Sequence, residues 1–199
     1  MVLPQSNPFS TRAVRPGAIP FVFAAGESAG WLVDRLRTSG WWGQIVGSHG
    51  SGKSTLLASL IPALEAAGRG VNLVTLHDGQ RRLPTGLDAL ERGNPSLQLV
   101  IDGYEQLSRW NRWKIKRFCR RQKCGLLVTS HADVGLPELF VVQPRLETAR
   151  RIVERLLPPG PQSIGPDDVA RSFERHGGDL RETLFDLYDL YEARRPQQT

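Results

Sequence analysis

The sequence predicts an α/β protein in which a parallel sheet is followed by a helical C-terminal part. Short apolar segments alternate with helical patterns from about residue 27 to residue 144, which indicates parallel strands joined by right-handed crossovers. A glycine-rich stretch separates the first strand from the helix after it, and beyond Pro144 only helical patterns remain. We therefore expect an extended arm over residues 1–26, a sheet domain over 27–144 and a three-helix lid over 145–199.

Each expected element is a periodic or apolar run bounded by turn residues. The expected strands are residues 44–46, 71–77, 97–101, 126–130 and 139–142. The strand 97–101 is apolar throughout, as is typical of a strand buried on both faces of a parallel sheet. The expected helices are residues 27–38, 56–68, 109–123, 145–157, 167–176 and 179–195. Pro62 should kink the second of these helices or end it early.

Composition places the chain among ordinary globular proteins. Hydrophobic residues make up 40% and charged residues 23% of the 199 residues, and no apolar run is long enough to span a bilayer. The N-terminus lacks the continuous apolar run of a secretory signal. Two cysteines, Cys119 and Cys124, are too few for a disulfide framework or a zinc site. We expect a cytoplasmic protein with no membrane partner.

The glycine-rich stretch carries the strongest functional signal. Residues 47–54 read GSHGSGKS and fit the pattern G-x-x-x-x-G-K-[ST]. The glycines let successive backbone N–H groups face one anion, and the helix that follows adds the positive end of its dipole. In this pattern the lysine reaches the β- and γ-phosphates and the next hydroxyl ligates Mg²⁺. We expect binding of ATP, in preference to GTP, with Mg²⁺ by residues Gly47, Ser48, His49, Gly50, Ser51, Gly52, Lys53, Ser54 and Thr55.

Two acidic residues follow the strand 97–101. Asp102 stands at the carboxyl end of that strand, where open α/β sheets bind ligands, and we expect it to hold Mg²⁺ together with Ser54. The alternative is an aspartate that only caps the next helix. Glu105 is the candidate general base, and its alternative is a surface glutamate favoured by a helix dipole. Because the strand 71–77 intervenes between the loop and Asp102, we expect the sheet order 5-1-4-3-2.

Three further segments resemble motifs of the AAA+ and STAND classes of P-loop NTPases. LVIDGYEQL resembles the Walker B box of the STAND class, notably its NACHT group, except that Gln106 replaces the last acid. LLVTSH resembles the sensor 1 strand, with Thr129 and Ser130 matching and His131 standing where an arginine is usual. HGGDLRETL resembles the sensor 2 helix of AAA+ lids and puts Arg181 at the sensor arginine position.

The resemblance implies an ATPase core with a helical lid that closes over the nucleotide. It adds Ser130 and Arg181 to Lys53 and Glu105 as catalytic candidates. The segment between His131 and Pro144 contains no arginine, which speaks against a ring-forming motor. We expect a slow Mg²⁺-dependent ATPase that acts as a switch or loader on a protein or nucleic-acid partner. A small-molecule kinase and a nucleotide-binding module with little turnover are the alternatives.

The excess of positive charge is concentrated in one segment. Residues 109–123 hold eight of the 26 lysines and arginines and no acid, whereas the net charge of the whole chain is only +6. We expect a helix whose apolar residues, including Trp110 and Trp113, pack on the sheet and whose bases face outward. This helix could contact nucleic acid or an acidic protein partner, or could simply be a solvated surface.

Overall fold

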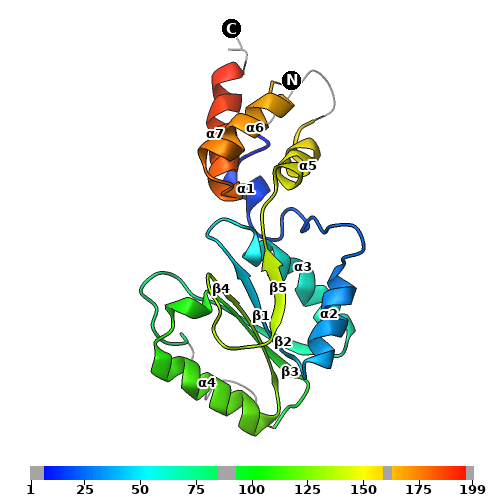
Figure 1. The fold of residues 1–199 in the computed structure, drawn as a ribbon, viewed down its shortest axis with the longest axis vertical. Helices are drawn as coiled ribbons and strands as arrows, with labels where there is room; N and C mark the ends of the chain where they lie inside the picture. The colour runs from blue at the N-terminus through cyan, green and yellow to red at the C-terminus, as the bar shows by residue number, and fades with distance from the viewer. Residues whose placement is uncertain (1–6, 85–92, 159–162, 196–199) are drawn as a thin grey trace, which may run out of the picture. The chain divides into compact units, whose positions relative to one another are not determined.

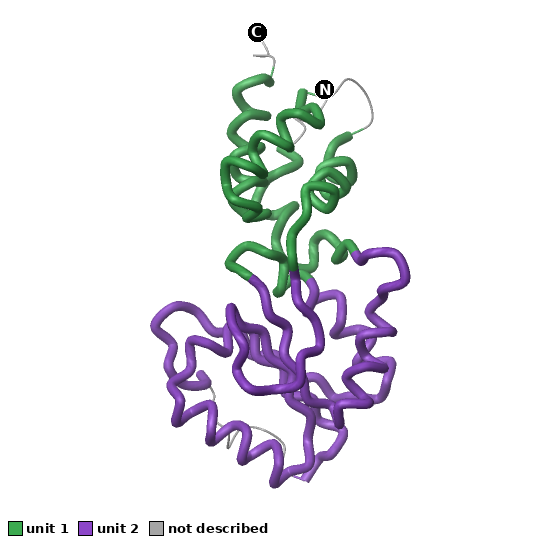
Figure 2. The backbone as a smooth tube through the Cα atoms, viewed as in Figure 1, with its two compact units in different colours: residues 1–22, 48–55, 143–199 green, residues 23–47, 56–142 purple. Residues whose placement is uncertain are grey.

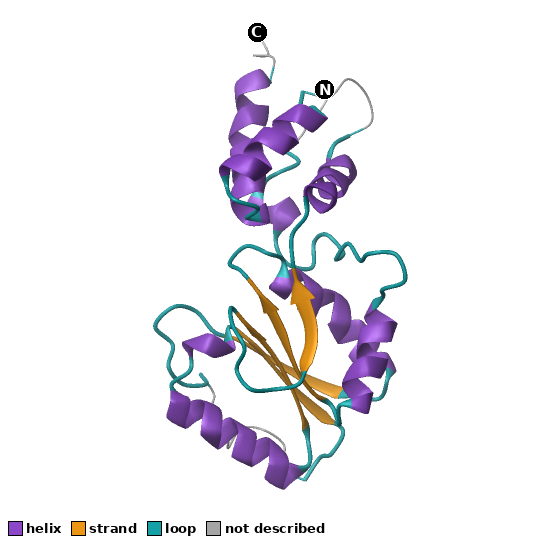
Figure 3. Ribbon diagram, in the orientation of Figure 1, coloured by secondary structure: helices purple, strands orange, loops and turns teal. Residues whose placement is uncertain are grey.

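A computed structural model describes residues 7–84, 93–158 and 163–195. Within these ranges the chain forms an α/β structure around a five-stranded sheet in which every strand pairing is parallel (Figures 1 and 3). The strands are β1 Trp42–Gly47, β2 Gly70–Thr75, β3 Leu97–Asp102, β4 Gly125–Ser130 and β5 Glu138–Val142. All five lie where the sequence predicts strands, within three residues at each end.

The strands are ordered β2-β3-β4-β1-β5 across the sheet. Read from the β5 edge, the same order is 5-1-4-3-2, which is the order expected from the strand that intervenes between the glycine-rich loop and Asp102. Parallel pairing brings the carboxyl ends of β1, β3 and β4 to one edge of the sheet. Every residue of β4 is buried, as are five of the six in β3, in keeping with their apolar sequences.

Capping residues mark several of the helix ends. The helices are α1 Thr11–Val14, α2 Ala29–Thr38, α3 Lys53–Ala66, α4 Arg109–Gln122, α5 Leu146–Leu156, α6 Pro166–Arg175 and α7 Leu180–Arg194, with a 3₁₀ turn η1 at Tyr104–Gln106. Ser28 and Ser108 cap α2 and α4 by accepting backbone N–H groups. Pro62 does not end α3, because the helical backbone continues past it to Ala66. Gly68, at φ +80°, follows the helix as its expected stop.

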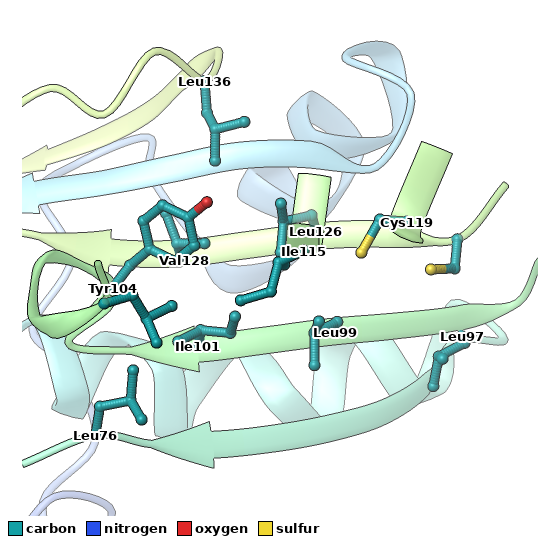
Figure 4. Close-up of a cluster of buried hydrophobic side chains, with 12 residues drawn as sticks. Leu76, Leu97, Leu99, Ile101, Tyr104, Ile115, Cys119, Leu126, Val128 and Leu136 are labelled. Atoms are coloured by element: carbon teal, nitrogen blue, oxygen red, sulfur yellow. The ribbon is translucent and has the colours of Figure 1, made fainter. Parts of the chain in front are cut away.

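One hydrophobic core fills the space between the sheet and α4, while α2 and α3 cover the opposite face (Figure 1). Figure 4 shows Ile115 and Cys119 of α4 beside Leu99 and Leu126 of the sheet. Cys119 and Cys124 are both buried free thiols. The apolar face of α4 therefore holds the helix on the sheet through Ile115 and Cys119.

The described residues form two compact units, coloured separately in Figure 2. The sheet unit comprises residues 23–47 and 56–142, and the helical unit comprises residues from 1–22, 48–55 and 143–199. The glycine-rich loop and the start of the chain thus group with the C-terminal helices. The domain boundaries expected after residues 26 and 144 stay predictions.

The N-terminal segment is anchored in the helical unit. Phe9 is fully buried in a core with α5, α6 and α7, and its ring meets the ring of Tyr191 edge to face at 6.0 Å between centroids. The Asn7 side-chain amide donates hydrogen bonds to the Tyr188 carbonyl at 3.1 Å and to the Glu192 carboxylate at 2.8 Å. The expected arm therefore supplies part of the core on which the three helices pack.

An ion pair between a buried aspartate and an exposed arginine joins α6 to α7. The Asp168 side chain is 8% exposed and receives two hydrogen bonds from the Arg194 guanidinium, at 2.6 and 3.0 Å. Arg194, together with the backbone N–H of Gly165 and with Arg171, holds the pKa of Asp168 well below its usual range, against the opposing effect of burial. The pair therefore stabilises the helical unit only while Asp168 is ionised.

The Asp168→Asn substitution should lower the free energy of unfolding by about 1–2 kcal/mol at neutral pH, because Arg194 loses its charged acceptor but is itself 40% exposed and partly screened by water. The folded-state pKa lies below the unfolded value of about 4, so this stabilisation is present above about pH 4 and is lost as the pH falls further. Urea unfolding at about pH 7 and about pH 3 should show the difference between wild type and variant shrinking in acid.

Asp186→Asn is the matched control. Asp186 pairs with Arg175 in the same two helices, but both side chains are far more exposed, at 29% and 62%. Its loss should change stability by about 1 kcal/mol at most. Equal effects of the two substitutions, or a pH-independent effect of Asp168→Asn, would contradict the assigned role of Asp168.

No helix within the described ranges has both the length and the apolar character needed to cross a membrane.

Candidate functional site

The loop between β1 and α3 adopts a backbone that only glycine accepts readily. Gly50 and Gly52 have φ values of +64° and +100°, in the left-handed region that disfavours a Cβ atom. The chain leaves β1 after Gly47 and enters α3 at Lys53. Ser54 and Thr55 then occupy the first turn of that helix, whose N-terminal N–H groups carry partial positive charge. The glycine pattern is as the sequence predicts, whereas α3 begins at Lys53, three residues before the expected start at Leu56.

The loop contains a buried cation and a buried hydroxyl. Lys53 is only 9% exposed, and its ammonium donates a hydrogen bond to the Ser48 carbonyl at 2.7 Å. Ser51 is 2% exposed, and its hydroxyl has no hydrogen-bond partner within the described residues. Buried polar groups are normally satisfied, so an unsatisfied hydroxyl in a tight loop marks a place where a polar ligand would gain a contact.

The Asp179 carboxylate, in the same compact unit as residues 48–55, lies against this loop. A Cβ atom added to Gly50 would come within 1.8 Å of the Asp179 carboxylate. Asp179 is also the N-cap of α7, where its Oδ1 accepts the N–H groups of Arg181 at 2.9 Å and Glu182 at 3.1 Å. His49 Nδ1 lies 3.8 Å from the other carboxylate oxygen. The glycine at position 50 is thus required by packing as well as by backbone conformation.

In the sheet unit, Asp102 is fixed by a hydroxyl from the neighbouring strand. The Thr129 hydroxyl donates a hydrogen bond to Asp102 Oδ1 at 2.5 Å and accepts the N–H of Gly103 at 2.9 Å. Thr129 is fully buried, so its hydroxyl orientation is fixed by these two partners. Asp102 Oδ2 makes no hydrogen bond within the described residues. One carboxylate oxygen is therefore held and the other is available to a ligand.

Glu105 lies in η1, just after β3. Its Oε1 is 3.3 Å from His131 Nε2, whereas its Oε2 is buried without a hydrogen-bond partner among the described residues. The guanidinium of Arg112 donates to the Glu105 carbonyl at 2.6 Å and so fixes the backbone of this turn. His131, which departs from the usual sensor arginine, is thus a direct neighbour of the candidate base.

The two remaining catalytic candidates have less distinctive surroundings. Ser130 is fully buried, but its hydroxyl donates to the Ala132 carbonyl at 2.5 Å and so holds the loop after β4. Arg181 lies in the first turn of α7 with an exposed side chain. The hydroxyl that contacts Asp102 belongs to Thr129. Thr129 belongs to the segment LLVTSH that resembles a sensor 1 strand. Its contact with Asp102 becomes visible only in the structure, where β3 pairs with β4.

The residues expected to act together form two groups, one in each unit. The sheet unit brings Asp102 together with Thr129, and Glu105 together with His131. The helical unit brings the loop residues 48–55 together with Asp179. A comparison of the chain with models of known protein families gave no match, and a comparison with curated protein sequences gave no significant match. Function is therefore inferred from the chemistry of these two groups.

The basic helix α4 departs from expectation at its tryptophans. Trp110 and Trp113 are 61% and 49% exposed, so the expectation that they pack on the sheet is wrong. Ile115 and Cys119 fill the inward positions instead, and helical spacing turns residues 110 and 113 away from that face. Helical periodicity alone does not show which face of α4 is buried, because aromatic residues occur on both faces.

The Gly50→Ala substitution should cost more stability than the backbone conformation alone explains. Its matched control is Gly177→Ala, because Gly177 also has a left-handed backbone, at φ +58°, but open space around its Cβ position. Both variants strain the backbone, but only Gly50→Ala displaces Asp179 from the N-cap of α7. We expect an additional loss of about 1 kcal/mol for Gly50→Ala in urea unfolding. Equal losses for the two variants would show that Asp179 does not depend on this contact.

Proposed function

We propose that this protein binds ATP with Mg²⁺ through the loop Gly47–Thr55 and hydrolyses it slowly, as a switch that acts on a partner molecule. The observation that carries the proposal is the loop itself. Two left-handed glycines precede a buried lysine at the start of a helix, and the loop follows directly on an internal strand of a parallel sheet. This combination of curled backbone, cation and helix N-terminus is suited to a chain of phosphates.

The chemistry of the loop fits a triphosphate. The Lys53 ammonium, now bonded to a carbonyl of its own loop, would exchange that neutral acceptor for phosphate oxygens. The unsatisfied Ser51 hydroxyl would gain a partner. Backbone N–H groups and the first turn of α3 would supply further donors without any side chain, which is why the glycines are needed.

The oxygen ligands that Mg²⁺ requires are also present in the chain. The proposal assigns the Ser54 hydroxyl as a direct ligand and Asp102 as a ligand that acts through water. The Thr129 hydroxyl holds one oxygen of Asp102, which leaves the second oxygen to accept from a metal-bound water. When bound, the metal would neutralise charge on the phosphates.

Slow hydrolysis is proposed from the surroundings of Glu105. We assign the Glu105 carboxylate, whose Oε1 lies close to His131, as the group that accepts a proton from an attacking water. Gln106 stands where the resembled motif has a second acid, and it donates a hydrogen bond to Asp78 at 3.0 Å. Because Glu105 is present but Gln106 replaces the second acid, we propose that ATP is hydrolysed slowly, at a rate suited to a timed switch.

The contact between Asp179 and Gly50 supports the switch. A triphosphate in the loop would bring negative charge close to the Asp179 carboxylate, and like charges at this distance repel. Because Asp179 also caps α7, its displacement would weaken the start of that helix. Arg181, in the same turn, could then offer its guanidinium to the γ-phosphate. Binding of ATP would thereby bias the arrangement of the helical unit.

The experiment that tests the proposal has two parts. Calorimetry with Mg·ATP and Mg·GTP measures binding and base preference. Phosphate release from ATP by the pure protein then separates an ATPase from a module with little turnover, and phosphate transfer to added small-molecule acceptors would indicate a kinase instead.

The Lys53→Ala substitution should weaken Mg·ATP binding by about 10- to 100-fold or more, because charge-assisted hydrogen bonds to the phosphates are lost. Arg155→Ala is the control, since Arg155 is an exposed base on α5, outside the loop. Circular dichroism should show the same fold in both variants. The phosphate-loop assignment fails if calorimetry finds equal ATP affinity in wild type and Lys53→Ala.

The Asp179→Asn substitution should tighten ATP binding about fivefold, because a negative charge near the triphosphate is removed. Asparagine caps helices as well as aspartate does, so α7 should keep its N-terminus. Asp189→Asn, an exposed acid farther along α7, is the control and should leave the affinity unchanged. Unchanged or weaker ATP binding by Asp179→Asn would remove Asp179 from the proposed switch.

A further inference from the structure

Two exposed tryptophans stack on each other at the surface of α4. The rings of Trp110 and Trp113 lie 4.9 Å apart between centroids with an angle of 16° between their planes. They are 61% and 49% exposed, although large aromatic rings are normally buried. Neither residue belongs to the core beneath α4. An aromatic pair kept at the surface marks a place where a partner can cover it.

Positive charge surrounds this pair. The Lys114 ammonium lies 5.5 Å from the centroid of the Trp110 ring, and the Arg117 guanidinium lies 5.5 Å from that of the Trp113 ring. Arg121 continues the same stripe one turn farther along the helix, and its side chain is exposed. Aromatic rings and cations are thus interleaved along one face of α4.

Not all bases of α4 belong to this face. Arg112 donates to the carbonyls of Glu105 and Leu107, and Lys116 donates to the carbonyl of Val134 at 2.8 Å. Burial and the neighbouring arginines lower the pKa of Lys116. These two bases hold the helix against nearby loops. Lys114, Arg117 and Arg121 lie instead on the face of α4 that carries the two tryptophans.

A hollow of about 440 Å³ adjoins the aromatic pair. Its lining residues are Arg81, Arg82, Ser108, Trp110, Asn111 and Lys114. The Asn111 amide donates to the Arg81 carbonyl at 2.7 Å, which fixes the arginine segment beside the start of α4. Two further exposed arginines therefore stand at the end of the stripe.

We infer that this surface binds single-stranded nucleic acid. Bases would stack on Trp110 and Trp113, while Lys114, Arg117 and the arginines of the hollow would contact the phosphates. A duplex keeps its bases stacked inside and could use only the cations. The carboxylates of an acidic protein would pair with the cations but do not stack on indole rings. Bases joined by phosphates supply both complements, so they fit the surface better than either.

The inference does not rest on nucleotide binding at the loop, since none of these residues belongs to residues 47–55. It can therefore be tested without ATP. The assay is fluorescence anisotropy with a labelled single-stranded oligonucleotide of about 16 nucleotides and mixed sequence, in low salt and in increasing salt. Lys53→Ala should bind the oligonucleotide as wild type does, whatever becomes of its ATP affinity.

Trp110→Ala and Trp113→Ala should each weaken oligonucleotide binding by about 5- to 100-fold, the value of one or more stacked bases. Both side chains are exposed, so the fold should survive. Replacing Lys114 and Arg117 together by Gln should reduce the salt slope by about 1.4, as expected for two lost phosphate contacts on a single strand. Wild type should prefer the single strand to the duplex of the same sequence.

The matched control is Trp31→Ala. Trp31 lies on α2, is 43% exposed and also has an arginine, Arg35, over its ring at 5.7 Å. It should leave oligonucleotide binding unchanged. The inference is overturned if wild type shows no binding in low salt, or if the substitutions at Trp110 and Trp113 have no more effect than Trp31→Ala. Tighter binding of poly-glutamate than of the oligonucleotide would assign the surface to an acidic protein instead.

Discussion

The turn from β1 into α3 is the constraint on which the rest of the structure depends. β1 is an internal strand, paired with β4 on one side and β5 on the other, so the loop that follows it starts from a fixed point. Left-handed glycines complete the turn between Gly47 and Lys53 and let α3 start at once. Because Gly50 lacks a Cβ atom, it also leaves room for the Asp179 carboxylate. The same few residues thus determine the backbone conformation of the loop, the start of α3 and the contact with Asp179, the N-cap of α7.

Much of this arrangement could be predicted because its causes are local in the sequence. β3 and β4 are apolar because both faces are covered, and that pattern is visible in a single sequence. The strand order follows from the presence of β2 between α3 and β3, combined with right-handed crossovers. The loop was recognisable because few other structures need glycines, a lysine and a hydroxyl at these spacings.

The rest could not be predicted because its causes join residues far apart in the chain. Asn7 contacts residues more than 180 positions away, and no local pattern distinguishes such an anchor from a free arm. The Thr129 hydroxyl reaches Asp102 only because β3 and β4 are neighbours in this register. The general preference of tryptophan predicts a buried Trp110, whereas on α4 the inward positions are filled by Ile115 and Cys119.

The double use of Asp179 limits how strong the proposed switch can be. An N-cap aspartate contributes about 1 kcal/mol to its helix, so displacing it fully would cost about that amount. Repulsion between its carboxylate and a phosphate about 4 Å away is of similar size, about 1 kcal/mol, when water screens the pair fully. A ligand can shift an equilibrium by no more than its difference in affinity for the two states. Through Asp179 alone, nucleotide binding would therefore change the population of the helical arrangement by about five- to tenfold. Any larger response would need a second contact made only with ATP, and we propose Arg181, two residues beyond the cap in the first turn of α7, for that contact.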